Sequence, residues 1–299
     1  MTREGSAGME KFTSWRDKGT GVSPFMPIEA RQSRLRAVLL ILVAIARIPF
    51  LVLCLSFYWI FSAKWVARFI VKTLFGFTRV EFLVDGVKKS RPDLINKNRP
   101  RRGDFILVNY TSAIDGWIVA ALSRVNYKDI ALVVPDKNQK LHCLSIWQFF
   151  THTLTPLFKE NQDSVITDIA QLRDKLVFCF AEGTATNNNA VLPFILRNLN
   201  DEIKSHFTIR TMVLKISPIS LTTPLPTVSG FSYLLQLLAN VNDKSAIRAK
   251  IFTHSDTELG DPLAYLRRCF EFSLLPLIGE ELNITKKESF YNYYTKTKK

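Results

Sequence analysis

Two short stretches of the chain place polar side chains directly after apolar runs, where they could take part in chemistry. The first, residues 106–117 (ILVNYTSAIDGW), leaves its apolar run at Asn109 and brings a single carboxylate, Asp115, six residues later. The second, residues 176–186 (LVFCFAEGTAT), ends in an acid followed by Gly-Thr. Such runs predict buried strands that end in loops. Loops at the carboxyl ends of strands commonly carry catalytic and binding residues in α/β proteins.

The residue types in these stretches allow acid–base chemistry and polar binding, and each also has a purely structural alternative. Asp115 could orient a catalytic base, or it could only cap the helix that begins there. Gly183 permits a tight turn or a close approach of a ligand, which leaves Glu182 and Thr184 available to a substrate hydroxyl or phosphate. Taken alone, this Glu-Gly-Thr sequence is equally compatible with a structural turn.

Taken together, the two stretches resemble the PlsC-type glycerolipid acyltransferases. The first motif of that family reads N-H-x-x-x-x-D and the third reads F-P-E-G-T-R-S, and this chain has N-Y-T-S-A-I-D and F-A-E-G-T-A-T. A Pro-Phe pair follows the second stretch, and a later apolar run is interrupted at Pro218, where the fourth motif falls. The resemblance spans residues 80–275 and the apolar segment before them. Residues 9–27 and 180–194 are similar, more narrowly, to a divergent fungal branch of the family.

This resemblance implies acyl transfer by general-base catalysis. In the family, a histidine oriented by the aspartate of the first motif removes a proton from a glycerol hydroxyl, which attacks an acyl-CoA thioester. Carried over by position, Asp115 is the orienting acid and Tyr110 occupies the place of the base. The residues that the resemblance implies for substrate binding are Glu182, Gly183, Thr184, Lys159 and Asn109.

The chain departs from the family pattern at several of these positions. Tyr110 replaces the histidine, and a phenol with a reference pKa of about 10 needs a strongly lowered pKa to act as a base at neutral pH. Ala181 replaces the usual proline, Ala185 replaces the usual arginine, and Lys159 offers a point charge in place of a bidentate guanidinium. None of the four histidines has an aspartate five residues on. His152 could enter the site from another element, but a core or surface role is favoured for it.

The elements that must position these residues alternate between strands and helices. Apolar runs predict strands at residues 80–84, 105–108, 130–134, 176–180, 212–219 and 246–252. Helices are predicted at residues 115–122, 144–151, 165–173, 233–238 and 262–275. This alternation predicts an α/β domain with a mainly parallel sheet flanked by helices.

Residues 37–63 give the strongest physical signal in the sequence, because they are apolar apart from one arginine and two serines. At about 1.5 Å per residue, a helix of this length exceeds the hydrocarbon core of about 30 Å. Arg47 and Pro49 leave two membrane arrangements open, a tilted span and a re-entrant hairpin bent at this point. A buried helix in a soluble core fits the length and the basic flank less well. Residues 65–77 then predict an amphipathic helix, either in the membrane interface or packed on the domain.

The expected organisation has four parts. Residues 1–36 are predicted to be a polar, flexible head, which is not a cleavable signal peptide because the apolar segment starts too late and is too long. Residues 37–77 are the membrane segment with its amphipathic helix, and residues 78–280 are the α/β domain, with a polar, basic loop at residues 88–102. Residues 281–299 are predicted to be a disordered, basic tail.

The formal net charge of +14 indicates an anionic partner, and composition alone does not say which one. Nucleic acid is poorly supported because the basic residues are dispersed and no recognition motif accompanies them. The four cysteines have no C-x-x-C spacing, so no zinc site or disulfide framework is indicated, and no metal or cofactor is expected beyond acyl-CoA as a co-substrate.

Two classes of function follow from these observations. In the first, the chain is a membrane-bound enzyme that transfers a long-chain acyl group from acyl-CoA to lysophosphatidic acid, on the cytosolic face of the endoplasmic reticulum or on lipid droplets. In the second, it is a catalytically silent relative that binds lipid or acyl-CoA and organises membranes. We expect the first, because a chain freed from catalysis has little physical reason to keep Asp115 and the Glu-Gly-Thr turn in matching places.

Overall fold

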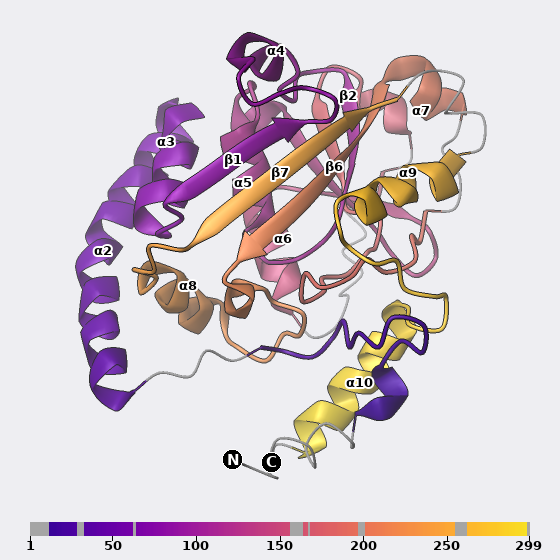
Figure 1. Cartoon of the computed structure of the whole chain (residues 1–299). Helices are drawn as coiled ribbons and strands as arrows, with labels where there is room; N and C mark the ends of the chain where they lie inside the picture. Colours follow the sequence, from indigo (N-terminus) through magenta and orange to yellow (C-terminus); the bar gives the residue numbers. More distant parts are fainter. Residues whose placement is uncertain are drawn as a thin grey trace.

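The computed structural model describes residues 12–28, 33–61, 64–155, 164–166, 168–196, 201–254 and 262–297. Within these ranges the strands form one seven-stranded sheet, and helices cover both of its faces (Figure 1). The strands are β1 (Arg79–Val84), β2 (Asp104–Val108), β3 (Ile130–Pro135), β4 (Leu141–Leu144), β5 (Leu176–Cys179), β6 (Thr208–Ser217) and β7 (Ala246–Thr253).

The sheet is mainly parallel, as the sequence predicts. Its strand order is β1-β7-β6-β2-β5-β3-β4. The pairs β1–β7, β2–β6, β2–β5 and β3–β5 are parallel, whereas β6–β7 and β3–β4 are antiparallel. The central strands β2 and β5 are therefore direct neighbours, and both motif loops begin at the same edge of the sheet.

The two faces of the sheet bury separate hydrophobic cores, which is why the central strands read as continuous apolar runs. Along β2, Phe105 and Leu107 join one core, whereas Ile106 and Val108 join the other. One face is covered by α5 (Asp115–Leu122), α6 (Ile146–Thr153) and α8 (Gly230–Leu238). The opposite face is covered by α7 (Asp201–His206) and α9 (Pro262–Phe272).

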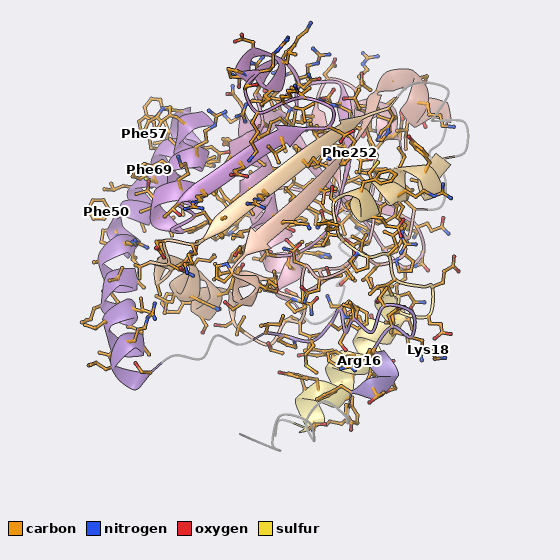
Figure 2. The ribbon with its side chains drawn as sticks, viewed as in Figure 1. Arg16, Lys18, Phe50, Phe57, Phe69 and Phe252 are labelled. Atoms are coloured by element: carbon orange, nitrogen blue, oxygen red, sulfur yellow. The ribbon has the colours of Figure 1, made fainter. Side chains whose placement is uncertain are left out.

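The apolar N-terminal segment is one continuous helix, α2 (Arg34–Phe61), which runs through Pro49. The re-entrant hairpin is therefore wrong. The helix lies along the domain beside α3 (Lys64–Phe69) and α8 (Figure 1). Its Leu35–Phe61 portion has a mean hydropathy of 2.9, and only 11% of that window is buried, so it is long and apolar enough to cross a membrane and is not a core helix. Figure 2 shows Phe50 and Phe57 directed away from the sheet.

Arg47 faces the protein and not the outer surface of α2. Its Nη1 donates hydrogen bonds to the carbonyl oxygens of Leu238 at 2.8 Å, Asn240 at 3.1 Å and Leu74 at 3.3 Å. Two of these carbonyls lie at the end of α8, where the last turn of a helix leaves carbonyls without partners and carries partial negative charge. Arg47 thus fastens α2 to the domain, and the expectation of an arginine at mid-depth in lipid or at a bend is corrected.

Two further expectations are corrected by the structure. Residues 165–173 do not form the predicted helix: Val165 bridges to His142, and a 3-10 helix covers only Ile169–Leu172. The apolar spacing that indicated a helix serves instead to bury Ile169 and Leu172 against the sheet. The basic loop at 88–102 contains a short helix, α4 (Pro92–Lys97), with proline at its start, where a missing N–H costs nothing.

The predicted flexible head and disordered tail are also corrected within the described residues. The tail forms α10 (Ile284–Thr297), and residues 12–28 pack against it (Figure 1). The ring centroid of Trp15 lies 5.4 Å from that of Phe290 and 4.9 Å from that of Tyr293. Aromatic residues at helical spacing in the tail therefore bury against aromatic residues of the head, because neither segment has enough apolar surface of its own.

Candidate active site

The two motif loops are joined through one carboxylate. Oε1 of Glu182 accepts a hydrogen bond from the backbone N–H of Tyr110 at 2.7 Å, and Oε2 accepts one from the N–H of Leu192, also at 2.7 Å. A third bond closes the junction, because the N–H of Thr186 donates to the Tyr110 carbonyl at 2.9 Å. Glu182 therefore sets the distance between the first and third motifs.

Both oxygens of Glu182 are engaged, and its side chain is 1% exposed. Burial raises the pKa of Glu182 to about 8, against the two backbone N–H groups and the charges of Arg267 and Lys287, which lower it. A carboxyl group in this position organises the loops of the site. Glu182 is not among the residues that line the pocket at this junction, and the role in substrate binding that the motif implies for it stays a prediction.

Asp115 has a similar internal role. Its carboxylate accepts hydrogen bonds from the backbone N–H groups of Thr111 at 2.6 Å and Ser112 at 2.9 Å, and from both hydroxyl groups. Burial raises its pKa to about 6, although these hydrogen bonds oppose the shift. Asp115 is the first residue of α5 and not its cap, since Ile114 takes that place. The structure gives it no hydrogen bond to the Tyr110 phenol, whose hydroxyl lies against Thr153, and the role of Asp115 as an orienting acid stays a prediction.

Asn109 is also occupied within the protein. Its amide nitrogen donates to the Leu214 carbonyl at 2.9 Å, and its amide oxygen accepts from the Leu214 N–H at 2.7 Å. The side chain thus continues the pairing of β2 with β6 after the strand has ended. Both halves of its amide are used by β6, and a role of Asn109 in substrate binding stays a prediction.

Tyr110 fills the space between the loops with its ring and carries its hydroxyl to the next helix. The ring stacks on Phe149 at 4.9 Å between centroids and contacts Phe180 at 5.1 Å. Its hydroxyl lies 2.6 Å from Oγ1 of Thr153 in α6. Burial raises the pKa of Tyr110 far above its ordinary value, and the charge of Asp115 adds to the shift. The phenol is therefore protonated at neutral pH, which argues against Tyr110 as the base.

The Glu-Gly-Thr turn needs glycine at its centre. Gly183 has a φ of 66°, in the left-handed region, and a Cβ there would lie 2.7 Å from the Pro135 carbonyl oxygen. The tight turn carries Thr184 to the wall of a small pocket. Of the residues expected to bind substrate, Gly183 and Thr184 line this pocket, whereas Lys159 lies outside the described residues.

The pocket has a volume of about 50 Å³ and lies where the first and third motifs meet. The pocket has room for a small polar group, because a single water molecule needs only about 10–15 Å³ of such space. An acyl chain does not fit. The residues that give it chemical character are Tyr110, His152, Thr184, Lys287 and Glu288.

His152 comes from the last turn of α6, and sequence reasoning favoured a core or surface role for it. Its place in the pocket brings an imidazole beside Tyr110. Burial, together with the charges of His142 and Lys287, lowers the pKa of His152 to about 4. The imidazole is therefore neutral at pH 7, which is the form that accepts a proton.

Lys287 is the functional candidate that sequence reasoning missed. Its Nζ donates to Oγ1 of Thr184 and to the carbonyl of Ala185, each at 2.7 Å. Ala185 is the position where the family motif carries arginine, so a cation from α10 reaches the place of the missing one. A helical pattern of Ile284, Lys287, Tyr291 and Tyr294 was available in the tail as a signal for this placement.

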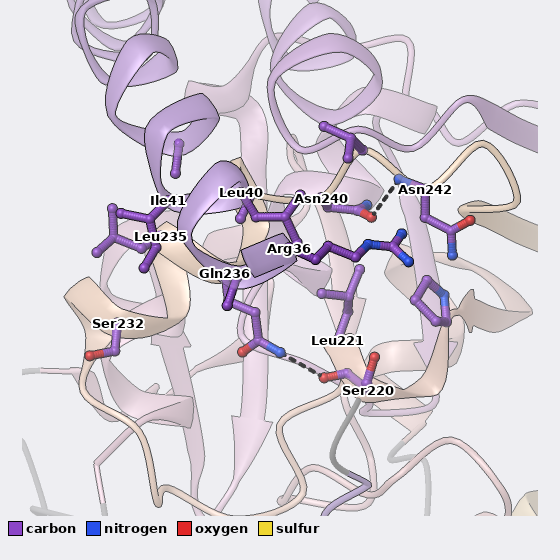
Figure 3. Close-up of a pocket in the computed structure, with 15 residues that line it drawn as sticks. Arg36, Leu40, Ile41, Ser220, Leu221, Ser232, Leu235, Gln236, Asn240 and Asn242 are labelled. Carbon is purple, nitrogen blue, oxygen red and sulfur yellow. Dashed lines mark hydrogen bonds between the residues drawn. The ribbon is translucent and has the colours of Figure 1, made fainter. Parts of the chain in front are cut away.

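A second, larger hollow lies between α2 and α8 (Figure 3). Its volume is about 440 Å³, and it is lined mainly by apolar residues together with Arg36. Pro218, where the fourth motif falls, is among its lining residues. The two hollows share no lining residue, and the first- and third-motif residues Tyr110, Gly183 and Thr184 line the small one.

Comparisons with known proteins find relatives among lipid acyltransferases. No protein-family model matches it. Lysophosphatidic acid:oleoyl-CoA acyltransferase 1 of Saccharomyces cerevisiae is 28% identical over 305 residues, which cover 96% of this chain and 97% of that protein. A Schizosaccharomyces pombe protein named after the same activity is 24% identical over 242 residues, which cover 75% of this chain and 79% of that protein.

A solved structure also aligns with the chain, namely the 1-acyl-sn-glycerophosphate (LPA) acyltransferase PlsC from Thermotoga maritima. The alignment covers 81% of this chain and 95% of that one, with 15% identity and a TM-score of 0.37, which is too low to compare the sites. The two sequence relatives, the first of which matches over nearly the whole length, carry the relationship. The chain is related to the PlsC-type glycerolipid acyltransferases.

Proposed function

We propose that the protein is a membrane-bound acyltransferase, which transfers a long-chain acyl group from acyl-CoA to lysophosphatidic acid and forms phosphatidic acid and free coenzyme A. The observation that carries the proposal is the meeting of the first and third motif loops at a pocket lined by the neutral imidazole of His152. The substrates are those named for the yeast relative, which the chain matches over 97% of that relative's length.

In this proposal His152 is the general base. Its imidazole takes the proton from the free glycerol hydroxyl of the acceptor, and that oxygen attacks the thioester carbonyl. The tetrahedral intermediate collapses, the C–S bond breaks, and the departing thiolate takes the proton from the imidazolium. An imidazole with a pKa of about 4 is a weak base, but an anionic acceptor bound beside it raises that pKa.

Tyr110 then has a different role from the histidine that it replaces. Its protonated hydroxyl holds Thr153, the neighbour of His152, at 2.6 Å. It therefore fixes the end of α6 and the side chain that this end carries into the pocket. Asp115 and Glu182 fix the two loops on the other side of the same pocket.

The membrane placement of the enzyme rests on α2. Exposed apolar side chains cover its outer face, while Arg47 ties its inner face to the domain. A helix held along the domain in this way brings the sheet against the lipid surface from which both substrates come. We place the domain on the cytosolic face of the endoplasmic reticulum, with lipid droplets as a further location.

A second candidate function is lipid binding without catalysis. The observation that favours it is that the carboxylates of Asp115 and Glu182 are both consumed by hydrogen bonds within the loops. A protein of this kind would keep the pocket but not turn over substrate.

An acyl-transfer assay separates the two candidates. Membranes from a host strain without background activity receive labelled oleoyl-CoA and lysophosphatidic acid, and the product is followed for the wild-type chain, His152→Gln and the empty strain. Phosphatidic acid formed by the wild-type chain and lost in His152→Gln supports the enzyme. A wild-type chain that forms no more product than the empty strain leaves the lipid-binding function in its place.

A further inference from the structure

Lys287 is a cation that the fold buries against the third-motif turn. It belongs to α10, and its ammonium group donates hydrogen bonds to Thr184 and Ala185. Lys287 is 9% exposed, whereas the neighbouring Lys286 on the same helix is exposed to solvent. An amphipathic helix can carry lysines on its solvent face at little cost, so the inward placement of this one calls for a partner.

The protein supplies acceptors for only some of the hydrogen bonds that Lys287 can donate. An ammonium group has three N–H donors, and Thr184 and Ala185 accept two of them. Among the described residues no carboxylate forms an ion pair with Lys287, and both oxygens of the nearby Glu182 accept from backbone N–H groups. Lys287 lines the same pocket as His152, which leaves its third N–H donor for a group bound there.

An anion in the pocket would complete this arrangement. It would accept the third N–H of Lys287, offset the desolvation of the ammonium and lie beside the imidazole of His152. Burial lowers the pKa of Lys287 to about 7, with the charge of Glu182 opposing the shift, and a bound anion would raise it and hold the lysine charged. The pocket, of about 50 Å³, has room for a group of the size of a phosphate.

We propose that Lys287 binds the phosphate monoester of the acyl acceptor and is thereby the residue that selects a phosphorylated lysolipid. This inference rests on the proposed function and adds to it the group that distinguishes lysophosphatidic acid from a neutral monoacylglycerol. The cation is contributed by a helix some hundred residues after the motif turn that it serves.

A structural role for Lys287, as a fastener of α10, predicts a different pattern of variants. A fastener needs only donors for Thr184 and Ala185, and the neutral amide of Lys287→Gln supplies these. Phosphate binding needs the charge, so neither Lys287→Gln nor Lys287→Met retains it. Lys286→Met is the matched control, because it removes the same charge from an exposed position on the same helix.

The test measures KM for lysophosphatidic acid and for monoacylglycerol at a fixed concentration of oleoyl-CoA, with the full chain in detergent. We expect Lys287→Met and Lys287→Gln to raise KM for lysophosphatidic acid by about 10- to 100-fold, the effect of losing one hydrogen bond between charged groups, with little change for monoacylglycerol. Lys286→Met is expected to behave as the wild type. Equal KM changes for both acceptors, or rescue by Lys287→Gln, would overturn the inference.

Two further arms keep the result interpretable. Oleoyl-dephospho-CoA replaces oleoyl-CoA in a parallel series, and if Lys287→Met abolishes the preference between these donors while it keeps the preference between acceptors, the acceptor assignment is wrong. Direct binding of the two acceptors to the wild type and Lys287→Met is measured without turnover. A wild type that binds lysophosphatidic acid through Lys287 but transfers no acyl group overturns the proposed function and upholds the inference.

Discussion

The carboxylate of Glu182 accepts a hydrogen bond of 2.7 Å from the backbone N–H of Tyr110, which lies 72 residues earlier in the chain. This bond joins the loop after β5 to the loop after β2. A side chain that the family motif assigns to the substrate is here part of the frame around the pocket. Its substitution should therefore first affect stability, and activity only through the geometry of the loops.

We predict that Glu182→Gln destabilises the protein by about 1–3 kcal/mol, because one of two buried backbone N–H groups loses its acceptor. Between pH 4.5 and about 8 the folded chain holds a proton on Glu182 that the unfolded chain has released, so the stability of the wild type falls as pH rises through this window. The stability difference from Glu182→Gln should therefore narrow toward pH 8. Thermal unfolding in detergent at several pH values measures it, and a difference that is constant with pH would contradict the raised pKa.

His152→Gln is predicted to lower kcat by about 100- to 10,000-fold, the usual contribution of a positioned general base. KM for the acceptor should change little, because Gln keeps a polar side chain of similar reach. His206→Gln is a suitable control, since its side chain belongs to α7 on the opposite face of the sheet. Steady-state kinetics decide the matter, and a normal kcat in His152→Gln would remove the imidazole from the mechanism.

Tyr110→Phe is predicted to keep most of the activity, within a few-fold of the wild type. The ring retains its packing on Phe149 and Phe180, and only the hydrogen bond to Thr153 is lost, at a cost of about 1 kcal/mol in stability. Parallel measurements of kcat and thermal unfolding test this. A complete loss of activity with unchanged stability would give the phenol a chemical role after all.

Arg47→Met is predicted to loosen α2 from the domain. Three carbonyl oxygens, those of Leu74, Leu238 and Asn240, lose their donor, which costs about 1–3 kcal/mol or more when they are buried from water. Hydrogen exchange at the end of α8 should rise, while Lys72→Met, an exposed change in the π-helix Ile70–Leu74, should leave it unaltered. If hydrogen exchange at the end of α8 is unchanged in Arg47→Met, this arginine does not hold α2 to the domain and faces the membrane instead.

Trp15→Ala is predicted to release α10 and, with it, Lys287. The indole contacts Phe290 and Tyr293 on this helix, and removal of a large aromatic side chain from such a cluster costs about 3–5 kcal/mol when it is fully buried, and less here because Trp15 is half-buried. KM for lysophosphatidic acid should rise in Trp15→Ala but not in Trp65→Ala, which removes an exposed indole. An unchanged KM would separate the head segment from the site.

The central sheet could be predicted from the sequence because its strands are continuous apolar runs buried on both faces. The helix at residues 115–122 was predicted with the observed bounds, and the parallel character of the sheet followed from alternation alone. The sequence does not show which way one polar side chain points, either on an apolar helix such as α2 or on a polar helix such as α10. Arg47 and Lys287 both point inward, and each contacts residues far away in sequence.

The position of the candidate site could be predicted from the sequence, but the side chains that line its pocket could not. The motif stretches identified the two loops that meet, whereas Asn109, Asp115 and Glu182 serve those loops internally, and the groups that line the pocket with them come from other helices. His152 was visible as a possibility, because it is one of four histidines. Lys287 was missed because lysine-rich tails are usually solvated, whereas this tail packs against residues 12–28 as a helix.

The placement of Lys287 on α10 also sets an order of events during synthesis. The anchor helix, the sheet and both motif loops leave the ribosome well before this helix, so the nascent chain can reach the membrane and fold its sheet while the pocket still lacks its ammonium group. A product interrupted before α10 would carry the anchor helix and the sheet but lack both the packing partner of residues 12–28 and the ammonium group at the pocket. Binding of the acceptor would thus report that translation had passed the last helix described.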